Sequence, residues 1–118
     1  DYEPKGDVKM GGKLQSKYPR KNWSSLIIFN NSYLANEALC PIFLNTYTGA
    51  HLHRFEWLQD SEIGSIPVEW NWLVDYYTET ESFKPKALHY TDGGPWLNQH
   101  KNCSYNKIWK AIHNEISR

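Results

Sequence analysis

The stretch ALHYTDGGPWL, residues 87–97, combines residue types that are suited to binding a phosphate group. His89 ends a short apolar run, and its imidazole can offer a neutral nitrogen to a divalent metal. Gly93 and Gly94 follow, and because they lack side chains their backbone N–H groups can approach phosphate oxygens closely. Trp96 can stack on a base or a sugar. An ordinary turn with a structural histidine has the same appearance, so the residues leave both interpretations open.

A second group of possible ligands surrounds His51 and His53, which are separated by one residue. On a strand this spacing puts both rings on one face, where Cys40, His89 or Cys103 could complete a tetrahedral zinc site. Two histidines at this spacing also occur by chance, and the pattern alone does not establish a metal.

Gln59 and Asp60 directly follow an aromatic segment that ends in Trp57 and Leu58. Catalytic and ligand-binding side chains often lie where a strand ends in a loop. The alternative for this pair is a simple strand-ending turn.

Aromatic residues are unusually frequent: the 118 residues include six tryptophans, eight tyrosines and four phenylalanines. Flat rings stack on sugars and bases, and an aromatic-rich core is the alternative explanation. The formal net charge is zero, which predicts no general attraction to nucleic acid or to membranes. The basic segment KMGGKLQSKYPRKNW, residues 9–23, could hold a diphosphate or be a solvated surface strip. With two distant cysteines and no membrane-spanning run, we expect a cytoplasmic protein.

Several segments carry the patterns of regular structure. We expect a loop with one short helical turn over residues 1–22, a buried strand over 23–31, a short helix capped by Ser32 that runs to about Leu39, an extended segment over 51–58, and a strand over 86–90. The alternation within residues 67–77 favours an extended segment, although a helix that starts at Pro67 is also permitted. Tyr105, Ile108, Trp109, Ile112 and Ile116 follow helical spacing and predict an amphipathic terminal helix capped by Ser104. These elements indicate an α/β to α+β fold, with a short mixed sheet and flanking helices.

The segments WLQDSEIGSIPVEWNWL and KALHYTDGGPWL, in this order, resemble the C-terminal half of nucleotide-sugar-dependent glycosyltransferases of the GT-A fold, the group that includes glycogenin and bacterial lipopolysaccharide galactosyltransferases. Three motifs of that group have matches within about residues 8–97. Gln59-Asp60 matches the last two positions of DQD, and Ile66-Pro67 and Trp70-Asn71 match the Leu-Pro and Trp-Asn element. His89-Tyr90, Gly93 and Pro95-Trp96 match the final strand and turn. NWSSLIIFNN resembles the central strand that lines the acceptor side.

The resemblance implies transfer of a sugar from a nucleotide diphosphate donor to a saccharide or protein acceptor, with Mn²⁺ or Mg²⁺ on the leaving diphosphate. The roles that it implies are catalysis for Gln59 and Asp60, metal binding for His89, contact with the donor and its diphosphate for Gly93, Gly94 and Trp96, and the acceptor side for Asn30, Trp70 and Asn71.

The chain departs from the family's pattern at three places. Leu58 stands where DQD begins, the lysine of the family's Lys-Pro-Trp ending is missing, and only Asp1-Tyr2-Glu3 imitates the Asp-x-Asp metal motif. We therefore expect residues 1–118 to be a single domain without its nucleotide-binding half, inactive by itself and prone to self-association through uncovered apolar surface. The alternatives are a non-catalytic carbohydrate- or nucleotide-binding module and a structural protein.

Overall fold

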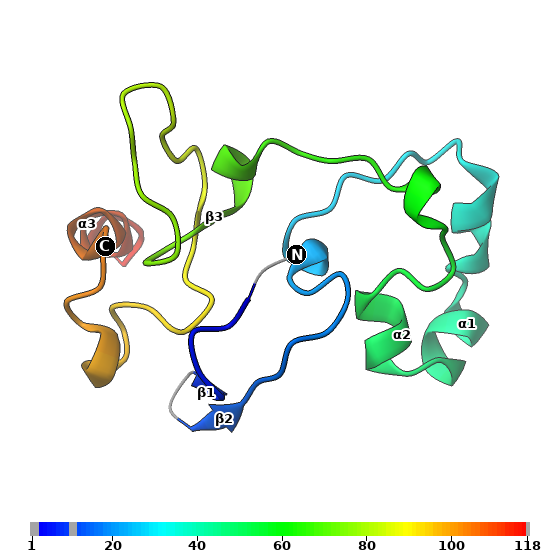
Figure 1. Ribbon diagram of the computed structural model, residues 1–118, viewed down its shortest axis with the longest axis horizontal. Helices are drawn as coiled ribbons and strands as arrows, with labels where there is room; N and C mark the ends of the chain where they lie inside the picture. The colour runs from blue at the N-terminus through cyan, green and yellow to red at the C-terminus, as the bar shows by residue number, and fades with distance from the viewer. Residues whose placement is uncertain (1–2, 10–11, 118) are drawn as a thin grey trace. The chain divides into compact units, whose positions relative to one another are not determined.

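The computed structural model describes residues 3–9 and 12–117, which divide into two compact units (Figure 1). The first unit contains Lys17–Ser65 together with Glu3 and Pro4, and the second contains the described residues of Lys5–Ser16 and Ile66–Arg118. Three α-helices and two two-stranded sheets form within the described residues, which confirms a small mixed α/β fold. Asp1 and Tyr2, which begin the imitation of the metal motif, lie outside the described residues.

Two short helices, α1 (Pro41–Thr46) and α2 (Gly49–His53), follow one another in the first unit (Figure 1). Pro41 opens α1, a position where its missing N–H costs nothing. Thr48 caps α2, because its side-chain oxygen accepts from the His51 N–H at 3.2 Å. The rings of Tyr47 and His51 stack with centroids 4.4 Å apart. The extended segment predicted over residues 51–58 is therefore wrong, and a local cap with ring stacking favours the helix.

The buried strand predicted over residues 23–31 is also wrong. A 3-10 helix covers Trp23–Ser25, and the apolar residues that follow are exposed, with Ile28 78% exposed. Leu26 has an extended backbone, but Ile27, Ile28 and Phe29 make no backbone hydrogen bond with any described residue. The β-forming side chains are present, and the partner strands are absent from the described part of the chain.

The short helix expected from Ser32 to Leu39 is a 3-10 helix, Leu34–Ala38, that begins after Tyr33. Its N-terminus is not capped by a side chain, so the cap expected from the start of this segment does not form.

In the second unit, β1 (Val8–Lys9) and β2 (Lys13–Leu14) pair antiparallel, with Val8 opposite Leu14 and Lys9 opposite Lys13. The sequence predicts a loop with one short helical turn for residues 1–22 and does not predict this hairpin, whereas the other described residues of that range form loops and turns.

The core of the second unit surrounds β3 (Trp72–Leu73), which pairs in parallel with β4 (Leu88–His89). Trp72 is fully buried, and its ring lies 4.9 Å from that of Phe83, centroid to centroid. The strand predicted over residues 86–90 is confirmed. Only part of 67–77 is extended, because a 3-10 helix, Val68–Asn71, precedes β3.

The terminal helix α3 (Asn106–Ile116) confirms the predicted amphipathic helix. It begins after Tyr105, which has a left-handed backbone with φ 58°, and Ser104 does not cap it. Trp109 packs on Trp96 with ring centroids 5.4 Å apart. None of the helices over the described residues is long and apolar enough to cross a membrane.

Candidate functional site

His89 is held at the end of β4 by contacts on both its backbone and its ring. Its carbonyl oxygen accepts from the Val74 N–H at 3.0 Å, which continues the parallel pairing with β3. Its Nδ1 lies 2.9 Å from Oδ1 of Asn71. Because an amide oxygen only accepts, Nδ1 carries the hydrogen and Nε2 carries the lone pair. Nε2 has no partner among the described residues.

The imidazole of His89 is kept neutral by its surroundings. Partial burial lowers its pKa below the ordinary value of 6.5, and the nearby positive charge of Lys9 lowers the pKa further. A neutral ring with a free Nε2 is the form that binds a metal or accepts a proton. Asn71 is placed to orient the ring of His89, since its contact with Nδ1 leaves Nε2 as the nitrogen that can bind a ligand.

The glycine turn after His89 is buried and covered by its own neighbours. A Cβ at Gly94 would lie 2.0 Å from the ring of Trp96, and a Cβ at Gly93 would lie 2.8 Å from Leu97. Gly93 has φ +119°, which only glycine adopts easily, and its N–H donates to the Tyr90 carbonyl at 3.2 Å. These glycines therefore let the chain fold back under Trp96, a residue that is itself 50% exposed.

The described residues do not make a metal site. They contain no group of three or more His, Cys, Asp or Glu side chains that could hold an ion. His89 fits one ligand position by its tautomer and neutral charge. The carboxylates that Mn²⁺ or Mg²⁺ prefers are not gathered around it.

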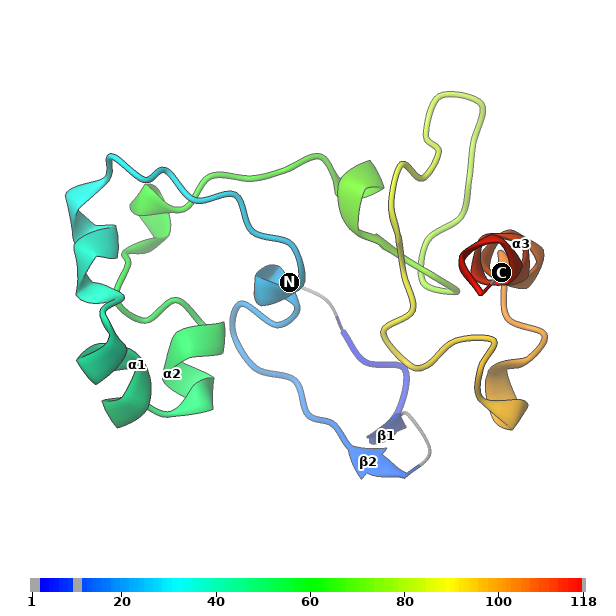
Figure 2. The same ribbon diagram turned by 180° about the vertical axis from the view of Figure 1, so that it is seen from behind.

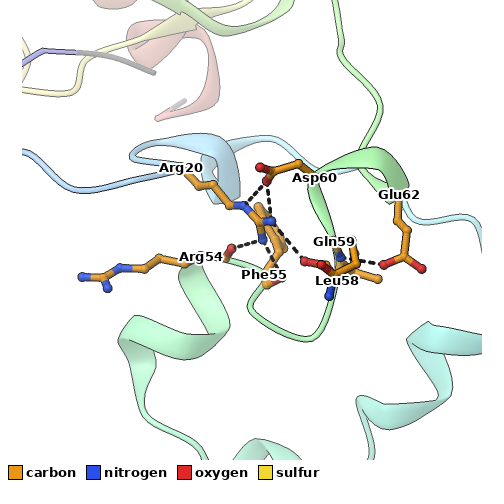
Figure 3. Close-up of polar contacts among 7 residues, drawn as sticks. All are labelled: Arg20, Arg54, Phe55, Leu58, Gln59, Asp60 and Glu62. Atoms are coloured by element: carbon orange, nitrogen blue, oxygen red, sulfur yellow. Dashed lines mark hydrogen bonds and ion pairs between the residues drawn. The ribbon is translucent and has the colours of Figure 1, made fainter.

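Gln59 and Asp60 lie in the first unit, where Arg20 binds the carboxylate of Asp60 (Figure 3). The Arg20 Nε and NH2 groups donate to Oδ1 of Asp60 at 3.0 and 2.5 Å. The remaining donors bind backbone carbonyls of the preceding turn: NH1 binds Arg54 at 2.6 Å and Phe55 at 2.7 Å, and NH2 binds Leu58 at 3.0 Å. Arg20 therefore fastens the turn and the carboxylate to one another.

The N–H of Gln59 donates to Oε2 of Glu62 at 2.6 Å, and this contact fixes the start of the 3-10 helix Asp60–Glu62 (Figure 3). The side chain of Asp60 is 85% exposed although one of its oxygens is held. Its Oδ2 has no partner among the described residues, so it can accept a hydrogen bond from a ligand hydroxyl.

The residues predicted for the acceptor side are not gathered in one unit. Asn30 lies in the first unit, where its Oδ1 accepts from the Ser32 N–H at 3.1 Å and shapes a turn. Trp70 and Asn71 lie in the second unit. Trp70 is exposed beneath the Lys86 ammonium, which lies 5.4 Å from the ring centroid, whereas Asn71 faces His89.

The zinc site considered for His51 and His53 does not form among the described residues. Both histidines lie on helix α2, not on a strand. Nδ1 of His51 lies 2.9 Å from Oε2 of Glu56, and Nδ1 of His53 lies 2.9 Å from the Ser24 hydroxyl oxygen. Cys40 and Cys103 are both free thiols.

Sequence reasoning missed Arg20 and the pairing of Asn71 with His89. Arg20 stands in the basic segment of residues 9–23, where five cations look equivalent, and nothing local shows which of them binds a turn near residue 55. Asn71 comes close to His89 because β3 and β4 pair in parallel, and the sequence alone does not show that register.

Most of the chain is similar to one curated plant protein, Protein CDI of Arabidopsis thaliana. The two sequences are 49% identical over 112 residues, which make up 92% of this chain and 43% of that protein. The chain therefore spans less than half the length of this relative. No model of a known protein family matches the chain, and no solved structure matches it.

Proposed function

We propose that the chain is the C-terminal portion of a nucleotide-sugar glycosyltransferase with a partial GT-A fold, which transfers a sugar to a saccharide or protein acceptor. The observation that carries this proposal is the neutral imidazole of His89, whose Nδ1 is held by Asn71 so that Nε2 is left to bind a ligand. The ordered motifs around Gln59, Trp70 and His89 add to it. A cytoplasmic location belongs to the same proposal, in keeping with two unpaired cysteines.

In this proposal Nε2 of His89 supplies one ligand to Mn²⁺ or Mg²⁺. The ion, when bound, neutralises charge that develops on the departing diphosphate. The described residues contain no complete metal-binding group, so the proposal assigns the other ligands and the nucleotide-binding half to residues outside the described ranges. The isolated chain is then inactive in transfer but retains part of the donor site.

The resemblance assigns Asp60 and Gln59 to the donor sugar. Arg20 occupies Oδ1 of Asp60, so Oδ2 is the oxygen that accepts from a sugar hydroxyl. The glycine turn contacts the diphosphate only if the ring of Trp96 moves aside, because Gly93 and Gly94 are buried beneath their neighbours.

Calorimetric titration of the chain with UDP-glucose, UDP-galactose and GDP-mannose, each with and without MnCl₂, tests the proposal. We expect one of the donors to bind in a manganese-dependent manner, and His89→Ala to weaken that binding by at least about tenfold. His53→Ala is the matched control, since it removes an exposed histidine from helix α2. A donor that binds equally well to His89→Ala would contradict the proposal. Sugar binding without metal would favour the non-catalytic binding module instead.

A further inference from the structure

We propose that Lys9 and Lys13, on the hairpin formed by β1 and β2, are the cations that bind the donor diphosphate beside His89, an inference that rests on the proposed function. No lysine or arginine stands between Lys86 and Lys101, so the turn after His89 has no positive charge of its own. The hairpin supplies the missing positive charge from a segment far away in the sequence.

The hairpin puts two positive charges opposite one another. Lys9 pairs with Lys13 in the antiparallel register. Like charges at directly opposed positions of a sheet destabilise it. Neither side chain forms an ion pair or hydrogen bond with another described residue, and Lys9 is partly buried. A bound anion would relieve this repulsion, whereas no described carboxylate does so.

The hairpin is fastened to the turn that follows His89. The backbone N–H of Lys5 donates to the Tyr76 hydroxyl at 3.3 Å, and that hydroxyl donates to Oδ2 of Asp92 at 2.7 Å. The Lys5 ammonium also lies 4.5 Å from the centroid of the Tyr76 ring. Figures 1 and 2 both show the blue chain that leads into β1 beside the yellow segment near residue 90.

Lys9 is near enough to His89 for its charge to act on the ring, since it contributes to the lowered pKa of that histidine. Lys9 and Lys13 occupy directly opposed positions of the hairpin, so their side chains leave the same face of it, and the hairpin and His89 both belong to the second unit. Lysine binds phosphate oxygens as a compact point charge, and a pair of lysines suits a ligand with two linked phosphates. Nucleotide diphosphates and inorganic pyrophosphate share this chemistry.

The test is titration with inorganic pyrophosphate and with UDP, followed through the NMR signals of His89. We expect both ligands to shift these signals, and the double variant Lys9→Gln with Lys13→Gln to weaken both affinities by at least about tenfold. The matched control is Lys107→Gln with Lys110→Gln, which removes two exposed lysines from helix α3 and should change the affinities by less than about twofold.

Equal pyrophosphate affinity in the hairpin variant and the unmodified chain would overturn the inference, as would an absence of pyrophosphate binding. A short single-stranded oligonucleotide that competes equally well would also overturn it, because the site would then bind any polyanion. If manganese-dependent donor binding needs His89 but not the two lysines, the proposed function stands and this inference fails. If the lysines bind pyrophosphate while no nucleotide sugar binds at all, the site stands and the proposed function fails.

Discussion

Nδ1 of His89 lies 2.9 Å from Oδ1 of Asn71, and this contact joins the strand β4 to the residue that precedes β3. The parallel register creates the contact, because Leu73 is paired with His89 and Asn71 lies two residues earlier. The asparagine therefore determines the tautomer of the only histidine that we assign to the donor site.

Replacing Asn71 with leucine removes the oxygen that accepts from Nδ1 of His89 and keeps a side chain of similar volume. We expect the imidazole of His89 to become a mixture of tautomers, and manganese-dependent donor affinity to fall by about 10- to 100-fold. Long-range ¹H–¹⁵N spectra report the tautomer directly. Asn71→Asp retains an acceptor oxygen and should keep the hydrogen on Nδ1. Unchanged ring nitrogen shifts in Asn71→Leu would show that the contact does not control the ring.

The stability of the fold should decrease in acid because of His89. Burial and Lys9 lower its pKa in the folded state below 6.5, so the unfolded chain binds the proton first as the pH falls. The stability that the neutral His89 contributes is fully present above the pKa that this histidine has in the unfolded chain, and it is lost as the pH falls through the pKa that it has in the folded chain. Urea unfolding between about pH 8 and pH 5 measures it. His89→Gln should show a smaller loss over this range than His53→Gln, and equal losses would contradict the assignment.

The elements predicted correctly from sequence are those whose signals are local. Helix α3 has one apolar stripe along its length, and Leu88–His89 is a short β-forming run bounded by a turn. The segment from Leu26 to Phe29 has equally strong β-forming residues, but a strand also needs partners, and none pairs with it in the described chain. The alternating aromatics of residues 51–58 also predict an extended segment wrongly. The Thr48 cap and the stacking of Tyr47 on His51 favour helix α2 at the start of this segment.

The guanidinium of Arg20 holds the turn before Asp60, and its removal should loosen that turn. Arg20 is 15% exposed and binds three backbone carbonyls in addition to the carboxylate. We expect Arg20→Ala to lower the free energy of unfolding by about 2 to 3 kcal/mol. Asp60→Asn should cost less than about 1 kcal/mol, because the carboxylate is mostly exposed. Hydrogen exchange of the amides from residue 55 to 62 should accelerate in Arg20→Ala, and unchanged exchange would contradict this role.

The sequence predicts the place of His89 at the end of a strand before a Gly-Gly turn, but it does not predict the contacts around them. His89 and the glycine turn follow from a strand running into a Gly-Gly pair. The burial of that turn under Trp96 depends on ring packing against Trp109 in α3, which local sequence does not encode. In the same way, Lys9 is one of several lysines in the basic segment until the hairpin register and its anchor at Tyr76 are known.

Gly94→Ala should displace the ring of Trp96. The added Cβ would lie 2.0 Å from Cζ3 of the ring, which is far closer than van der Waals contact allows. Since Trp96 is 50% exposed as a residue, its ring can rotate outward, and we expect a shifted tryptophan emission with a stability loss of about 1 to 2 kcal/mol. Gly64→Ala is the control, because a Cβ there meets no atom within 4 Å. Emission identical to that of the control would show that the ring does not cover the turn.

The segment from Leu26 to Phe29 should drive self-association at high concentration. Its apolar side chains are exposed, and the backbone groups of Ile27–Phe29 have no partners within the described chain. Such a segment is a template for pairing with another strand. We expect Ile28→Lys to shift the sedimentation profile toward monomer, since a lysine side chain opposes edge pairing. Ile116→Lys on helix α3 is closely matched, because Ile116 is 80% exposed and Ile28 is 78% exposed. If only Ile116→Lys shifts the sedimentation profile toward monomer, self-association depends on α3 and not on the segment from Leu26 to Phe29.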